Sequence, residues 1–393
     1  MTADSSRNTP LILFLSLVAL GFLVWIYYTP IWWVSLTAPN YPPESFPDGV
    51  RIHFHMNGVF NGCKKVEKAE ITEEEALDCV HEMDTINHYV GMYPIAAGGV
   101  IERAFSPFLL SMLGFMILGF AIPWRGVRLL LMGLGFSGIV VWMWLTFYGE
   151  NGLRFQNMGY LSALVTSLNQ GADEDQEEEM TPAQALIARL KAEMAAVQEA
   201  QQGEKAEENG EPLSEKQKLI QSLRKSFEKY QERKPAQERE DWTGSGAQVL
   251  RWHYEASLGR YFNDPAKIGP MSQTMSQAAD AVFWLLAAAM LLLLWGARKD
   301  RGLLYWLLIL VPLALPLFFI ADYAAWLWWY GHTLNDMGAF TVKPFMPTVF
   351  GDGKVAQFAT HSYPYIGFGL MVALSAILAL IALLRRKQIK RAS

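Results

Sequence analysis

The sequence predicts an α-helical integral membrane protein with six transmembrane helices and three long extracytoplasmic loops. Three observations support this fold class. Only 18% of the 393 residues are charged, below the roughly 25% typical of soluble domains. Six stretches are apolar over about 20 residues, the length that a helix needs to cross a bilayer. The short loops between these stretches concentrate arginine and lysine, as cytoplasmic loops do.

The first apolar stretch covers residues 11–28, after a short segment at 1–10 that we expect to be cytoplasmic. It lacks an Ala-x-Ala-like cleavage site and continues into Trp32 and Trp33, which suit a membrane interface. We interpret it as an uncleaved anchor, with a cleavable signal peptide as the alternative. The other predicted spans lie at 105–122, 129–148, 278–295, 303–320 and 365–384.

Basic residues flank the predicted spans in three clusters. The positive-inside rule places these clusters and both termini in the cytoplasm, so the loops at 29–104, 149–277 and 331–364 are extracytoplasmic. The chain is therefore expected to be a multi-pass protein of a bacterial inner membrane. The clusters comprise Arg125 and Arg128, then Arg298, Lys299 and Arg301, and finally the tail at 385–393.

All seven histidines fall in the three long loops. No haem is expected, because a membrane haem needs axial histidines within its helices and no C-x-x-C-H motif is present. The predicted spans are also poor in ionisable residues, so the chemistry is expected in the loops. The histidines are His53, His55, His81, His88, His253, His332 and His361.

The first long loop carries the strongest candidate site. Alternation from Val50 to Met56 predicts a strand that places His53 and His55 on one face, where two imidazoles can share a metal ion. A half-exposed strand with its polar side chains turned outward explains the pattern equally well. A short helix is expected from Glu73 to Met83.

Other residues could extend this pair into a composite metal site. His88 and Met92 are four residues apart and would share a face if this segment is helical. Imidazole and thioether together favour copper. The predicted metal ligands are His53, His55, Met56, His88, Met92, His332 and His361.

The two cysteines, Cys63 and Cys79, have two interpretations. Outside the cytoplasm thiols tend to oxidise, and a disulfide over this spacing would stabilise the fold by about 3 kcal/mol. Alternatively the pair stays reduced and forms a redox or Cu(I) site beside His81 and Met83. The structural disulfide is the simpler interpretation.

The second long loop has an unusual composition. Its acidic run at 173–179 is typical of a solvated linker. Two capping boxes, Thr181–Gln184 and Ser214–Gln217, each precede an apolar stripe with the same spacing. We therefore predict a helical hairpin over 181–234, which would serve contact with another protein.

Two blocks of sequence resemble a known group of proteins. The blocks are NHYVGM at 87–92 and the Gly- and Pro-rich run from Trp326 to Phe358. Together they resemble multi-span membrane proteins encoded with nitrous oxide reductase, a periplasmic copper enzyme. The resemblance implies an accessory role in respiration or in maturation of the copper centre, with the enzyme or its maturation proteins as partners.

Three functions are compatible with these observations. The first is a membrane-anchored assembly factor that handles copper in its outer loops. The second is a permease or channel component, in which Pro312 and Pro316 break the fifth span around a path. The third is a scaffold that recruits partners through the hairpin.

Enzymatic activity is not expected from the motifs in the sequence. It contains no G-x-S-x-G elbow, P-loop or H-E-x-x-H motif. Nucleic acid is not an expected partner, because the basic residues are sparse and flank the membrane.

Overall fold

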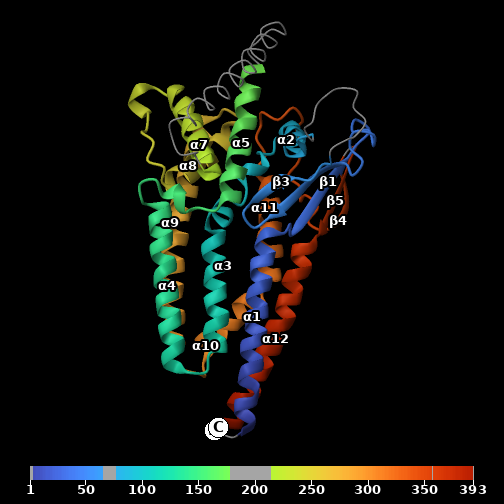
Figure 1. The fold of residues 1–393 in the computed structure, drawn as a ribbon. Helices are drawn as coiled ribbons and strands as arrows, with labels where there is room; N and C mark the ends of the chain where they lie inside the picture. The colour runs from blue at the N-terminus through green and yellow to red at the C-terminus, as the bar shows by residue number, and fades with distance from the viewer. Residues whose placement is uncertain (1–2, 65–76, 178–213, 356, 393) are drawn as a thin grey trace.

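The computed structural model describes residues 3–64, 77–177, 214–355 and 357–392. Long helices form a bundle, and the three predicted outer loops fold together into one head at the same end of it (Figure 1). The bundle helices are α1 (Ala3–Tyr28), α3 (Val100–Ala121), α4 (Arg125–Phe147), α9 (Pro265–Gly296), α10 (Leu303–Leu313), α11 (Leu315–His332) and α12 (Ile366–Ala392).

Five of the described helices are long and apolar enough to cross a membrane, and α10 with α11 can form a sixth span. The prediction of a multi-pass helical membrane protein is confirmed at this level. The predicted span at 303–320 is not one straight helix, because the chain bends by 65° between α10 and α11. Pro312 and Pro316 each lack the N–H that would continue the helical hydrogen bonds. Ser375 of α12 donates to the freed carbonyl of Leu313 at 2.7 Å.

The head is built around a five-stranded antiparallel sheet in the order β3-β2-β1-β5-β4. Its central strand β1, from the first loop, pairs with β5 from the third, so two distant loops share one sheet. The strand predicted at 50–56 is confirmed as β2. The strands are β1 (Trp32–Thr37), β2 (Val50–His55), β3 (Gly58–Asn61), β4 (Gly351–Val355) and β5 (Phe358–Pro364).

The two faces of this sheet differ in burial. On the covered face, Trp32 packs against the rings of Phe319 and Tyr323 in α11, and Ile52 joins an apolar cluster with helix α2. On the other, which we call the open face, the side chains are half-exposed. The open face comprises Trp33, Arg51, His53, His55, His361 and Tyr363.

Helix α2 (Cys79–Tyr89) starts later than the helix predicted at 73–83. Asp78 sets its start, because the Asp78 carboxylate accepts hydrogen bonds from the Val80 and His81 amides. The helix ends at Tyr89, so Met92 lies in the following turn. The segment from His88 to Met92 is therefore not one continuous helix, which was the condition for these two residues to share a face.

The second loop contributes α5 (Met158–Glu177), α7 (Glu215–Glu232) and α8 (Gly246–Gly259) to the head. The acidic run was predicted as a linker from 173, but α5 continues through Glu177. The capping box at Ser214 is confirmed at the start of α7. Phe227 of α7 packs on Trp252 of α8. The first arm of the predicted hairpin lies outside the described residues, so the hairpin as a whole stays a prediction.

Two arginines of the basic clusters, Arg128 and Arg385, are buried at the end of the bundle away from the head. Arg128 is fully buried, where its guanidinium pairs with Asp300 at 2.7 Å and donates to the carbonyl of Ala297. Arg385 and Arg128 both donate to the carbonyl of Ile122. Ile122 and Ala297 are the C-caps of α3 and α9, and free carbonyls at a helix C-terminus attract cations.

The two blocks that carry the resemblance touch each other. The amide of Asn335 donates to the carbonyl of Gly91 at 2.8 Å, and the amide of Phe340 donates to that of Tyr89 at 3.0 Å. A Cβ at Gly338 would lie 2.7 Å from the Gly91 Cα, so only glycine allows this approach. The blocks thus form one junction between the first and third loops.

Candidate functional site

His53 and His55 lie side by side on the open face, as the alternation predicted. The His53 ring stacks on Tyr365 with centroids 5.3 Å apart, and the His55 ring contacts the edge of Phe60 at 4.9 Å. His53 Nε2 is buried without a hydrogen-bond partner among the described residues. Aromatic neighbours therefore fix the orientation of both rings.

Both imidazoles are held in the neutral form. Burial and, to a smaller extent, the neighbouring His53 together lower the pKa of His55 to about 4. Burial also lowers the pKa of His53, assisted by the positive charge of Arg51. Because a metal binds the unprotonated imidazole, this pair is ready to bind a metal at neutral pH.

The third loop does not complete the pair. His361 lies on β5, and β1 separates it from β2, which places it about 10 Å from the strand of His53. Its Nδ1 pairs with Asp352 at 2.7 Å. His332 stacks on Trp328 at the end of α11, and its Nδ1 contacts the Trp328 carbonyl.

The remaining predicted ligands are also dispersed. His88 packs on the rings of Tyr261 and Phe262. Met56 packs against the main apolar core, and Met92 lies beyond α2. Within the residues described, no three His, Cys, Asp or Glu side chains converge to hold a metal ion. The composite seven-ligand site is therefore not assembled in this structure.

Cys63 and Cys79 are joined in a disulfide, with their Cα atoms 6.0 Å apart. The bridge ties the end of β3 to the first residue of α2, and Cys79 is fully buried. In this state neither sulfur is a thiolate ligand for a metal.

A second polar cluster, which we call the seam, was not predicted. It joins the first and second loops where the head meets the bundle. Asp84 is 1% exposed and pairs with Arg260 at 3.3 Å, while its carboxylate also accepts from the Ile95 amide. The seam comprises Asp84, Arg103, Ser167, His253 and Arg260.

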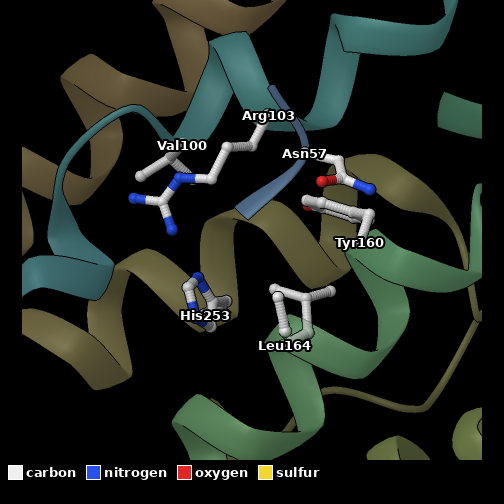
Figure 2. A pocket seen from close by; sticks show the side chains of 7 residues that line it. Asn57, Val100, Arg103, Tyr160, Leu164 and His253 are labelled. Atoms are coloured by element: carbon white, nitrogen blue, oxygen red, sulfur yellow. The ribbon is translucent and has the colours of Figure 1, made fainter. Parts of the chain in front are cut away.

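A small cavity opens beside the seam. Figure 2 shows Arg103 of α3 and His253 of α8 facing the same space, with Asn57 and Tyr160 around it. Asn57 Oδ1 and His253 Nδ1 are buried and have no partner among the described residues. The cavity volume of about 10 Å³ suits about one water molecule, which would bridge these atoms, and is too small for a substrate.

His253 was interpreted from the sequence as an interfacial residue between Trp252 and Tyr254, but it is 2% exposed inside the head. Burial, with the charges of Arg103 and Arg260, lowers its pKa to about 3. The seam residues come from separate loops and follow no local spacing. The one available signal was a charged pair, Glu102 and Arg103, at the start of an apolar helix.

Comparison with protein families, with curated proteins and with solved structures finds no match for this chain.

Proposed function

We propose that this protein is a membrane-anchored accessory protein that handles copper through His53 and His55 and presents it to a respiratory metalloenzyme or its maturation proteins. The observation that carries the proposal is a pair of neutral imidazoles side by side on the open face of the head. The two sequence blocks suggest nitrous oxide reductase as the enzyme served. The head would then face the periplasm of a bacterium.

The chemistry of the pair suits transfer of a metal more than storage. Two imidazoles leave coordination positions open, and a partner can fill them when it takes the ion. The positive charge of Arg51 beside His53 opposes a bound cation and weakens its retention. Imidazole alone suits copper, zinc and nickel, so the choice of copper rests on the resemblance.

Copper titration of the purified full-length protein against a colorimetric chelator tests the proposal. The variant with both His53→Ala and His55→Ala should lose one equivalent of bound copper. His361→Ala and His332→Ala are matched controls, because the structure holds these histidines apart from the pair, and both should keep the equivalent. If the double variant binds as much copper as the wild type and unfolds at the same temperature, His53 and His55 are not copper ligands.

A second candidate, a permease for a metal or small solute, is favoured by the break between α10 and α11. Broken helices inside a membrane occur where a path or binding site is built. The carboxyl of Glu102, which accepts from Trp326 of α11, lies near this broken span. Flux of copper or zinc into liposomes containing the protein is the test. No flux above that of empty liposomes would exclude the permease for these ions.

A further inference from the structure

Arg51 on the open face is a cation that lies over aromatic rings and, among the described residues, forms no ion pair with a carboxylate. Its guanidinium carbon lies 4.1 Å from the centroid of the Trp33 ring and 5.7 Å from that of Tyr365. Arg51 Nε is buried and has no hydrogen-bond partner among the described residues. The cation–π contact with Trp33 fixes the guanidinium, and no hydrogen bond from its Nη atoms is recorded among the described residues.

The acidic groups on the same side of the head are already engaged. Asp48 pairs with Lys64 at 2.7 Å. Asp352 accepts from His361 and from the Tyr363 hydroxyl at 3.0 Å. Among the described residues Arg51 therefore makes no ion pair, although its charge, after that of Lys64, helps to lower the pKa of Asp48. The ring of Trp33 fixes the position of this charge.

Two bundle helices, α1 and α12, set the position of Arg51 and the rings of Trp33 and Tyr365. Strand β1 begins four residues after α1 ends, and Tyr365 immediately precedes α12. The Tyr365 amide donates to the carbonyl of Ile31, which joins the two emerging chains. Arg51 pairs with Ser35 in the sheet, but its guanidinium lies over Trp33, which is two residues closer to α1. The side chain therefore extends toward the bilayer.

We propose that Arg51, Trp33 and Tyr365 form a binding site for the phosphate of an anionic phospholipid headgroup. Tryptophan and tyrosine prefer the headgroup level of a membrane, where lipid phosphate is concentrated. The guanidinium fork matches two oxygens of a phosphodiester. One arginine holds free phosphate weakly, whereas a lipid is already confined beside the site, so the occupant is the lipid. The proposal stands independently of metal binding by His53 and His55.

Lipid retention by the detergent-purified full-length protein, measured by native mass spectrometry, tests this site. Mixed micelles supply phosphatidylglycerol or phosphatidylcholine. The wild type should retain phosphatidylglycerol preferentially, and Arg51→Gln should reduce this preference about fivefold, which corresponds to the ~1 kcal/mol that one arginine contributes at an anionic surface.

Lys354→Gln is the matched control, because Lys354 is an exposed cation on β4, the strand at the other end of the same sheet, and it should retain the preference. An equal thermal transition for the two variants in phosphatidylcholine shows that both are folded. The proposal is overturned if Arg51→Gln keeps the full preference, or if Lys354→Gln loses as much. It is also overturned if millimolar inorganic phosphate displaces the lipid, because the site would then take a free anion.

Discussion

The seam and the open face contain the same kinds of side chain in opposite arrangements. In the seam, Asp84 and Arg260 are both at least 95% buried and pair with each other. On the open face, Arg51 is half-exposed and lies over aromatic rings, with no ion pair to any residue that the structure describes. Both regions hold neutral histidines, but His253 is enclosed whereas His53 and His55 are at the surface.

The difference separates a structural role from a binding role. Charges that satisfy each other inside a protein hold elements together and have little capacity left for a ligand. Charges and imidazoles fixed by rings at a surface keep that capacity. We therefore place the function of the head on the open face and assign the seam to attachment of the head to the bundle.

The largest expected effect comes from breaking the seam. Asp84→Asn removes the charge that compensates the buried Arg260, which should destabilise the protein by about 3–5 kcal/mol. Thermal unfolding in detergent measures the loss. Asp336→Asn, at a 94% exposed carboxylate, is the control and should change stability by about 0.5 kcal/mol or less. Equal effects of the two variants would show that the seam is not the attachment.

Removing the disulfide should have the next largest effect. Replacing both Cys63 and Cys79 by serine releases a bridge between residues 16 apart, with an expected loss of about 3 kcal/mol. Chemical denaturation followed by the near-ultraviolet signal of the head measures it. Copper stoichiometry should not change, because the proposed ligands are His53 and His55. A lost equivalent would instead assign the metal to the cysteines.

A smaller loss is expected at the junction of the two sequence blocks. Gly338→Ala introduces a methyl group 2.7 Å from the Gly91 backbone, so the first and third loops must separate, at a cost of about 2 kcal/mol. Limited proteolysis of the head should accelerate. Gly133→Ala is the control, since a Cβ there meets nothing within 4 Å. Equal proteolysis rates for the two variants would contradict the close contact.

The smallest effect concerns pH on the open face. The folded pKa of His55 is about 4, below the usual 6.5, so protons bind the unfolded chain first. The contribution of the neutral His55 to the free energy of unfolding is fully present above pH 6.5. It is lost as the pH falls toward 4 and does not change further below that. We expect the protein to lose about 1 kcal/mol of stability through His55 over this pH range, because water screens this half-buried ring.

Thermal unfolding of wild type and His55→Gln in chelator-treated buffer, from pH 7.5 to 4.5, measures this contribution. The variant should show a shallower decline, and part of the decline that remains comes from His53 and His253, whose pKa values burial also lowers. Parallel curves would show that His55 is as accessible to protons in the fold as in the unfolded chain.

Local signals allowed the bundle to be predicted, although not every helix end. Helix α9 starts at Pro265, thirteen residues before the predicted span at 278–295, because Asp264 caps it and polar residues continue the helix out of the apolar region. The break between α10 and α11 was signalled by Pro312 and Pro316. The burial of Arg128 was not predictable, because it depends on which helix ends pack around it.

The head was mostly beyond prediction, because its contacts join distant parts of the chain. Trp32 and Trp33 suit an interfacial belt as well as a strand, and only pairing with β5 distinguishes the two. The alternation of Val34 and Leu36 with Ser35 and Thr37 was a usable hint. The side-by-side placement of His53 and His55 followed from the period of a strand, whereas the separation of His361 follows from the sheet order.

The central position of β1 has a consequence for the synthesis of this protein. Trp32 donates to Ser362, 330 residues later in the chain. At about 5–20 residues per second, a ribosome needs roughly 15–60 s to make that interval. During this time one edge of β1 has no partner strand, and an unpaired edge can add to a strand of another chain. Strand β1 of the first loop therefore stays without β5 until the third loop has been synthesised. The head is completed only when the final helix is being made.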